Sequence, residues 1–160
     1  MKRRIWLIAA ALLLASGCAS MNPPVDVVTT AAQAPNFTLL SKAIQQAGLT
    51  ETLKGTGPFT VFAPTDEAFK RLPAGALEKL LANPEQLRSV LTYHVVSGRV
   101  ASGEFKNGAV KTVQGAPLTV SRAGTFVIVD EATVIQPDIA ATNGIIHAVD
   151  RVLMPPPAKK

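Results

Sequence analysis

Cysteine is nearly missing from this sequence, because the chain of 160 residues contains only one, at position 18. A single cysteine excludes an internal disulfide framework and a cysteine-rich zinc module. Charged residues are also few, at 17% of the chain, while apolar residues make up 48%. A chain of this balance is not held open by charge repulsion, and it carries enough apolar surface for the core of one domain.

Long apolar runs are absent as well. The longest extends from Ile5 to Ala15, whereas a membrane-spanning helix needs about 20 residues. Three basic residues at positions 2–4 precede this run, and small residues follow it, which is typical of a secretory signal peptide. We therefore predict a signal peptide over residues 1–17 rather than a buried core helix, which would not be apolar around its whole circumference.

The end of the apolar run is Leu14-Ala15-Ser16-Gly17-Cys18, which resembles the lipobox of bacterial lipoproteins, although leucine is commoner where Ala15 stands. The resemblance implies that Cys18 is acylated, with palmitate, and that this lipid anchors the protein in a membrane of the cell envelope. Ala19 implies, by the same resemblance, sorting to the outer membrane, on its periplasmic or outer surface. The alternative is ordinary cleavage nearby, which leaves a soluble exported protein with a free thiol.

The positive charge of the chain lies mostly outside its predicted domain. The formal net charge is +5 and the pI is near 9.7, which is the composition expected for a nucleic-acid partner. However, three basic residues belong to the signal peptide, and Lys159 and Lys160 follow a run of three prolines at the C-terminal end. The remaining residues contain 11 basic and 11 acidic side chains. We therefore expect no nucleic-acid partner.

The chain beyond the signal peptide is predicted to be one domain between two short extensions. Residues 18–24 form a tether that Pro23 and Pro24 stiffen. Residues 25–154 form the domain, and residues 155–160 form a tail rich in proline and lysine.

Helical signals fill the first half of this domain, and strand signals fill the second half. Asp26, Asn36, Thr65 and Asn83 stand where the N-caps of four helices are expected, each followed by apolar residues at helical spacing. Short apolar runs between Gly, Asn and Pro turns predict strands. These strands are Phe59–Ala63, Val95–Ser97, Ala109–Val113, Leu118–Ser121, Phe126–Asp130, Thr133–Ile135 and Ile145–Leu153. The pattern predicts an α+β fold.

Three stretches of the domain stand out by their sequence and their order. They are Thr60-Val-Phe-Ala-Pro-Thr-Asp-Glu-Ala-Phe69, the pair Tyr93-His94, and Gly144-Ile-Ile-His-Ala-Val-Asp-Arg-Val-Leu153. They resemble the first signature, the central Tyr-His pair and the second signature of the fasciclin domain family. The resemblance implies a fasciclin-like fold, a wedge of β-strands packed with several helices. It also implies that five residues of these signatures have structural roles. They are Thr65, Asp66, Tyr93, His94 and His147.

The resemblance further implies a binding module with no cofactor and not an enzyme, because fasciclin domains usually serve in adhesion or matrix-type interactions. In animal members, an Asp-Ile pair before the second signature takes part in cell attachment. Asp138 and Ile139 occupy that place here, on what we expect to be a loop after Pro137. They are candidate contact residues for an unknown envelope protein or polysaccharide. The alternative for Asp138 is that it only shapes a turn.

The two histidines are the residues best suited to catalysis or metal binding. The periodicity places His94 and His147 on apolar faces, so we interpret them as core residues with satisfied hydrogen bonds, and we predict no metal site. Tyr93 is likewise expected in the core with its hydroxyl bonded, and Thr65 and Asp66 suit the start of a helix. The chain has no Gly-x-Ser-x-Gly nucleophile motif. The alternatives are an envelope hydrolase that uses His94 or His147, and a structural component of an envelope complex.

Overall fold

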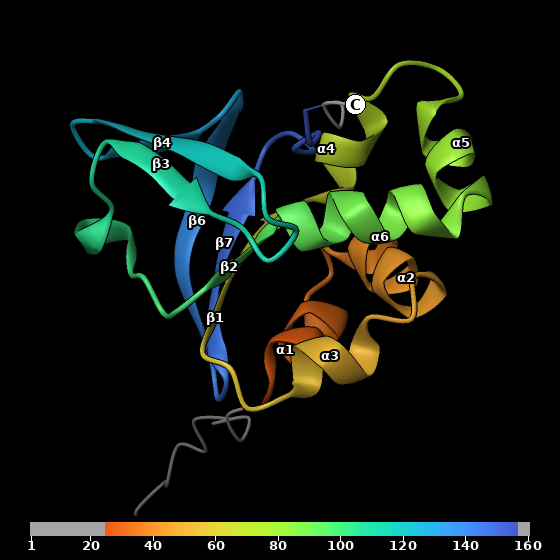
Figure 1. The fold of residues 1–160 in the computed structure, drawn as a ribbon, viewed down its shortest axis with the longest axis horizontal. Coiled ribbons are helices and arrows are strands. Elements are labelled where there is room, and N and C mark those ends of the chain that lie inside the picture. The colour runs from red at the N-terminus through yellow and green to blue at the C-terminus, as the bar shows by residue number, and fades with distance from the viewer. Residues whose placement is uncertain (1–24, 157–160) are drawn as a thin grey trace, which may run out of the picture.

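The structure, a computed structural model, describes residues 25–156, with helices packed on one side of a curled sheet (Figure 1). The predicted signal peptide, Cys18, the tether and the last four residues lie outside the described part. Most of the helices precede most of the strands along the chain. The helices are α1 (Val27–Gln33), α2 (Thr38–Gln46), α3 (Thr50–Lys54), α4 (Asp66–Lys70), α5 (Ala76–Ala82), α6 (Pro84–Tyr93) and the 3-10 helix η1 (Ser102–Glu104).

The strands form one sheet, in the order β2-β1-β7-β6-β5-β4-β3. They are β1 (Phe59–Pro64), β2 (Val95–Ser97), β3 (Gly108–Lys111), β4 (Pro117–Ala123), β5 (Phe126–Val129), β6 (Ala132–Ala141) and β7 (Gly144–Val149). Strands β1 and β7 pair in parallel, and the other neighbours are antiparallel. The predicted α+β class is confirmed.

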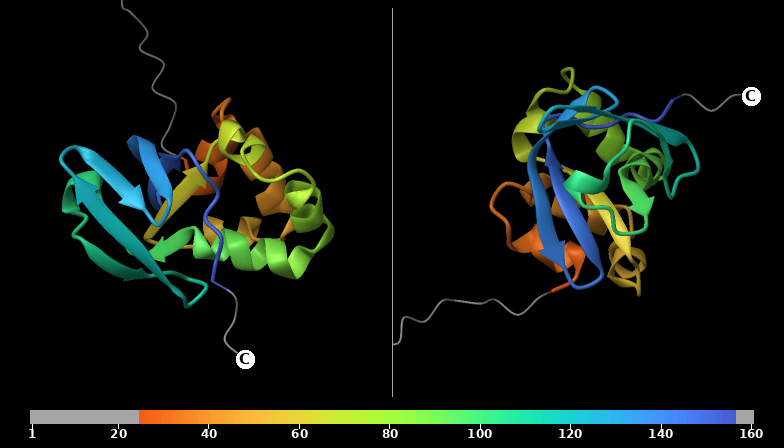
Figure 2. Two further views of the ribbon diagram at one scale, coloured as in Figure 1. Left: turned by 90° about the horizontal axis from the view of Figure 1, so that it is seen from above. Right: turned by 90° about the vertical axis from the view of Figure 1, so that its left-hand side faces the viewer.

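The sheet curls until its two outer strands approach each other. Val96 in β2 and Thr112 just after β3 form an isolated antiparallel bridge. Next to it, the N–H of Val113 donates to the carbonyl of Val95 at 2.7 Å. Figure 2 shows the curled strands β3 to β5 on one side of β1 and β7 and the helices on the other. The two central strands are therefore covered on both faces.

Two apolar cores result, one on each face of these central strands. Because successive side chains of a strand point to opposite faces, Ile146 and Ala148 pack against the helices. Phe62 of β1 and Val149 of β7 pack into the curl of the sheet. All six residues of β7 are buried as a consequence.

Three of the four predicted helix caps are confirmed. Asp26, Thr65 and Asn83 each accept a hydrogen bond from the backbone N–H three residues further along the chain. Such caps pair a donor that the first turn of a helix leaves free.

The prediction that Asn36 caps α2 is wrong. Instead, the carboxylate of Asp66 accepts hydrogen bonds from the N–H of Leu39 at 2.9 Å and from the hydroxyl of Thr38 at 2.6 Å. Asn36 contributes its carbonyl, which accepts from the N–H of Asp66 at 2.9 Å. Because Asp66 is also in the first turn of α4, one carboxylate stabilises the positive ends of two helices.

Element boundaries differ most from the prediction in strands β6 and β7. Strand β6 extends to Ala141, well past the predicted end at Ile135, and β7 ends at Val149 rather than Leu153. Two register shifts between β6 and β7, on either side of Gln136, accommodate Pro137, which has no N–H to donate to a regular ladder. Helix α3 was not predicted, since five residues carry too short a pattern.

Asn143, in the turn between β6 and β7, ties the first helices to the sheet. Its amide nitrogen donates to the carbonyls of Leu53 at 2.8 Å and Gly55 at 2.9 Å. Its side-chain oxygen accepts from the N–H of Val27 at 2.9 Å. One side chain therefore satisfies backbone groups at the start of α1 and at the end of α3.

We expect Asn143→Ala to lower the free energy of unfolding by about 3 kcal/mol, because it leaves three partly buried backbone groups without their partner. Urea unfolding followed by circular dichroism measures this loss. The control is Asn83→Ala, which removes an exposed cap and is expected to cost about 1 kcal/mol. Equal losses for the two variants would contradict the role given to Asn143.

Candidate functional site

His94 is buried at the carboxyl end of α6, and both of its ring nitrogens face backbone groups. Its Nδ1 lies 2.7 Å from the carbonyl of Val90, and its Nε2 accepts from the N–H of Leu153 at 2.9 Å. Because a carbonyl only accepts, the proton of the neutral ring is on Nδ1. Burial lowers the pKa of His94 to about 4. The hydrogen bond to the Val90 carbonyl acts to raise this pKa, and burial outweighs it. The ring holds the segment after β7 against α6.

His147 is buried in the middle of β7 and carries the opposite tautomer. Its Nε2 lies 2.9 Å from the carbonyl of Val100, while its Nδ1 accepts from the N–H of Asp138 at 3.2 Å. The rings of Phe62 and Phe105 lie at centroid distances of 5.8 and 5.3 Å. Burial lowers the pKa of His147, although the Val100 carbonyl and the Asp138 carboxylate act in the other direction.

These contacts confirm the prediction of buried, hydrogen-bonded histidines. A general base must present a free nitrogen to the proton that it removes. In His94 and His147 both nitrogens are used by the backbone, so neither ring is arranged to meet a substrate in this structure. Among residues 25–156 no group of His, Cys, Asp and Glu side chains is placed to hold a metal ion.

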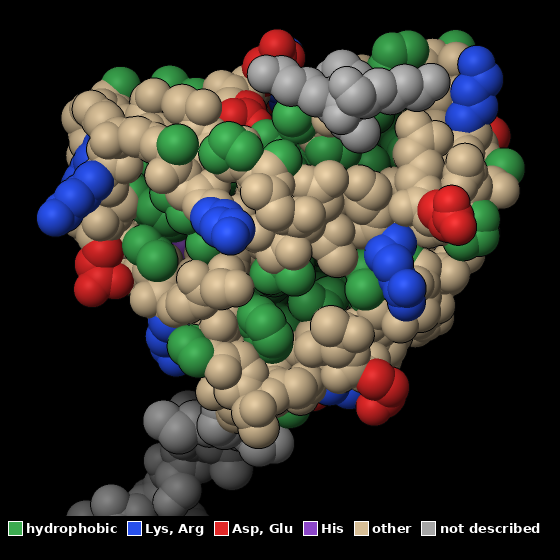
Figure 3. Space-filling view, in the orientation of Figure 1, with side chains coloured by type: hydrophobic (Ala, Val, Ile, Leu, Met, Phe, Trp, Pro, Cys, Tyr) green, Lys and Arg blue, Asp and Glu red, His purple; other side chains and the backbone are tan. Residues whose placement is uncertain are grey.

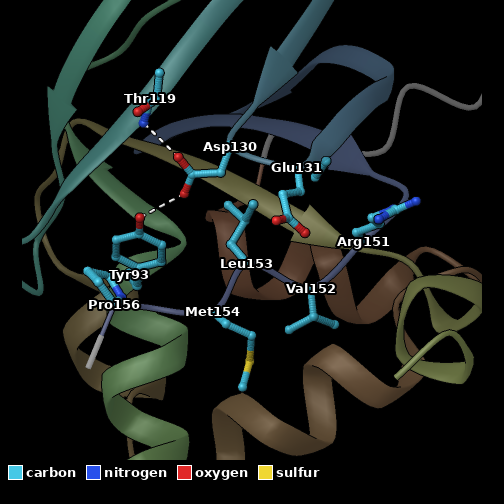
Figure 4. Close-up of a pocket in the computed structure, with 10 residues that line it drawn as sticks. Tyr93, Thr119, Asp130, Glu131, Arg151, Val152, Leu153, Met154 and Pro156 are labelled. Carbon is cyan, nitrogen blue, oxygen red and sulfur yellow. Dashed lines mark hydrogen bonds between the residues drawn. The ribbon is translucent and has the colours of Figure 1, made fainter. Parts of the chain in front are cut away.

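Tyr93 is buried, and its hydroxyl is bonded, as predicted. The hydroxyl donates to the carboxylate of Asp130 at 2.7 Å (Figure 4). The other oxygen of this carboxylate accepts from the N–H of Thr119 at 2.9 Å. Burial, together with the Asp130 carboxylate, raises the pKa of the Tyr93 hydroxyl above its ordinary value. The carboxylate thus joins α6 to β4, a role that sequence reasoning missed.

Asp138 and Ile139 lie within strand β6, so the prediction that they are on a loop is wrong. The strand continues because its register shifts around Pro137, and Asp138 takes a positive φ of 59° there. Ile139 is half-buried and packs against the helical core. Asp138 is exposed at the surface beside it. The structure therefore presents the pair from a sheet rather than from a flexible segment.

The Asp138 carboxylate is fixed by Ser102 of η1. It accepts hydrogen bonds from the N–H of Ser102 at 2.8 Å and from the Ser102 hydroxyl. Partial burial acts to raise the pKa of the Asp138 carboxyl, but these hydrogen bonds outweigh it, so the pKa lies below its ordinary value. Ser102 was not recognised in the sequence, because no local pattern links two residues on different segments.

The surface around this pair is an open stretch of sheet edge. Strand β5 pairs with β6 only as far as Thr133, so beyond that point the side of β6 facing away from β7 has no strand partner among the described residues. The open edge therefore presents the half-buried Ile139 beside one fixed carboxylate.

On one face of the molecule the charged side chains are dispersed. Lys and Arg side chains on the face shown in Figure 3 lie apart from one another, among Asp and Glu side chains. Among the residues of the described part, no helix is long and apolar enough to cross a membrane.

Comparison with known proteins identifies the family. The fasciclin domain model matches residues 35–155. Protein sll1483 of Synechocystis sp. is 42% identical over 140 residues, which cover 86% of this chain and 78% of the relative. The cell surface glycolipoprotein MPB83 of Mycobacterium bovis is 37% identical, with 86% and 59% covered. The chain is also 44% identical to the transforming growth factor-beta-induced protein ig-h3 of Sus scrofa. This match covers 87% of the chain and only 21% of that protein.

The fold agrees with this identification. A FAS1 domain pair from the insect cell adhesion molecule Fasciclin I matches with a TM-score of 0.72 at 20% identity, over 82% of this chain and 51% of that one. The chain belongs to the fasciclin domain family. Domains of this family are generally adhesion modules without enzymatic activity, and the homologues suggest an adhesion or binding module.

We expect the stability of the protein to fall between pH 6.5 and pH 4, because an unfolded chain takes up a proton on His94 in this range and the folded chain does not. The contribution of His94 to this loss is about 3 kcal/mol, from a pKa lowered to about 4. Urea unfolding at several pH values measures the slope. In His94→Gln the protein should be less stable at pH 7 and should lose less stability on acidification. An unchanged slope would contradict the assignment.

Proposed function

We propose that the protein is a lipid-anchored adhesion or binding module of the bacterial cell envelope, and that Asp138 and Ile139 contact a protein or polysaccharide partner. The family and its cell-surface relative MPB83 support an adhesion module outside the cytoplasm. The observation that carries the proposal is the way in which Asp138 is presented, as a carboxylate exposed at the surface yet held by Ser102.

A fixed carboxylate is suited to recognition, because a side chain that is already ordered loses little conformational entropy when a partner binds. Ile139 packs against the helical core on one side and leaves part of its side chain at the surface beside Asp138. Together they combine apolar area with one directed acceptor, which is the usual composition of a contact surface. A partner with a hydrogen-bond donor opposite Asp138 would suit this arrangement.

The membrane partner in this proposal is reached through the lipid on Cys18. Each buried methylene of an acyl chain contributes roughly 0.8 kcal/mol, so two or more chains hold a protein on a membrane without any transmembrane helix. Six residues, 19–24, separate Cys18 from the first described residue, Val25. Extended at about 3.3 Å per residue, they would place the domain close to the membrane surface.

Cys18→Ser is expected to release the protein from membranes, because it removes the acceptor of the acyl chains. Fractionation of cells followed by immunoblotting measures the distribution. Labelled palmitate should enter the wild-type protein and not the variant. Ser16→Ala is the matched control, since it changes the same segment and keeps the thiol, and it should stay on membranes. Absence of label from the wild-type protein would contradict the proposed lipid anchor. It would not contradict the proposed binding module.

Asp138→Ala combined with Ile139→Ser is expected to reduce surface attachment of a complemented deletion strain at least twofold. The double variant removes both the fixed carboxylate and the apolar contact. Retained cells in a crystal-violet assay measure attachment. Glu78→Ala is the control, because it removes an exposed carboxylate on α5, away from this pair, and it should keep full attachment. Full attachment by the double variant, at wild-type protein levels, would exclude this pair as the contact.

A further inference from the structure

Three adjoining cavities follow the segment after β7, and Asp138 is not among the residues that line them. One of about 600 Å³ lies beside Tyr93, a middle one has about 430 Å³, and one of about 560 Å³ lies beside Thr65. The first two share Glu131, Arg151 and Met154 as lining residues. The middle and last share Arg71, which follows α4. We call the whole the C-terminal groove, lined by α4, the β5–β6 turn and residues 150–156.

The groove contains much of the exposed apolar surface of the molecule. Four large apolar side chains among residues 25–156 are markedly exposed, and two of them, Ile135 and Met154, line this groove. Figure 4 shows Met154 reaching out beside Val152 and Leu153, which form the adjoining wall. Exposed apolar side chains gathered in a concave surface are characteristic of binding sites.

The charge of the groove is negative, in contrast to the balanced domain. Five carboxylates line it, against three cationic side chains. The carboxylates are Asp66, Glu67, Asp130, Glu131 and Asp150, and the cations are Lys70, Arg71 and Arg151. A polyanion, whether a nucleic acid or an acidic polysaccharide, is repelled by such a lining.

Two of these charged groups have no partner within the described chain. Lys70 bonds Glu67 at 2.6 Å, and Arg71 bonds Asp150 at 3.0 Å. By contrast, Glu131 and Arg151 make no hydrogen bond or ion pair with residues 25–156. Both lie where the first and middle cavities meet, and Figure 4 shows Arg151 pointing away from Tyr93. This place offers one free acceptor group and one free donor group.

An extended peptide has the chemistry that matches this lining. Its backbone N–H groups suit Glu131, its carbonyls suit Arg151, and its side chains reach Met154 and Ile135 at about 3.3 Å per residue. Lysine or arginine side chains on the peptide complement the negative excess. A neutral sugar would find no exposed aromatic face, since Tyr93 is buried.

We propose that the C-terminal groove binds an extended segment of another envelope protein that carries basic side chains. This goes beyond the contact surface proposed above, since it names a second surface and the chemistry of its partner. It depends on neither the lipid on Cys18 nor the Asp138 site.

A library of random linear heptapeptides displayed on phage, panned against the purified mature protein, tests the proposal. We expect the recovered peptides to be rich in lysine and arginine. Their synthetic forms should bind at least tenfold more weakly to Glu131→Lys and to Met154→Asp, in fluorescence anisotropy. Both side chains are exposed, so both variants should keep the wild-type unfolding midpoint. The matched control is Glu78→Lys on α5, which makes the same charge change outside the groove and should bind normally.

Four results would overturn the proposal. The first is recovery of peptides without a basic bias, or of none. The second is equal binding of the selected peptides by wild type and Glu131→Lys. The third is binding that appears only after residues 157–160 are deleted, which would make the chain's own tail the occupant of the groove. The fourth is loss of peptide binding in the Asp138→Ala, Ile139→Ser variant. This loss would show that the groove and the Asp138 surface are one site, which contradicts the proposal of a second surface.

Discussion

Burial of strand β7 on both faces is the constraint on which the rest of this structure depends. One face supports the helices through Ile146 and Ala148, and the other closes the curl of the sheet through His147 and Val149. A strand in this position must be apolar nearly throughout, and parallel pairing with β1 requires a long connection, which helices α4 to α6 and strands β2 to β6 supply. The two cores therefore share a single central element.

The two histidines provide hydrogen-bond partners for backbone groups that are buried around β7 without a strand partner. Irregular segments cross the core edges at Val100, Asp138 and Leu153, where no neighbouring strand pairs their backbone groups. A buried N–H or carbonyl without a partner is costly, and the rings of His94 and His147 provide one donor and one acceptor each. The opposite tautomers follow from which nitrogen meets a carbonyl. Both rings are thereby committed to structure, which agrees with the binding role of the family.

Both surfaces proposed for recognition are built on regular structure rather than on long loops. The open edge of β6 holds Asp138 through Ser102, and the C-terminal groove is walled by a helix and a β-turn. A surface that is ordered before binding loses little conformational entropy on association. In the anchored state proposed above, such a module could bind weakly through each contact and still hold firmly when many copies on one cell engage together.

Local patterns in the sequence predicted much of the fold. The α+β class, most strands and the caps at Asp26, Thr65 and Asn83 could be predicted, because a cap bonds a donor three residues away and alternation is visible in a short window. The burial of both histidines followed from the apolar periodicity around them. The family resemblance singled out Asp138 and Ile139, though not the strand that carries them.

Contacts between distant segments were decided only by the tertiary structure. Asp66 caps a helix 27 residues earlier, Asn143 bonds α1 and α3 from a hairpin turn, and Ser102 fixes Asp138 from another connection. The C-terminal groove combines three parts of the chain in the same way. The sequence by itself determined most of the helices, strands and core residues, apart from α3 and the second half of β6. Which distant polar groups meet depends on how those segments pack, because a hydrogen bond needs a partner within about 3 Å and no local spacing specifies one.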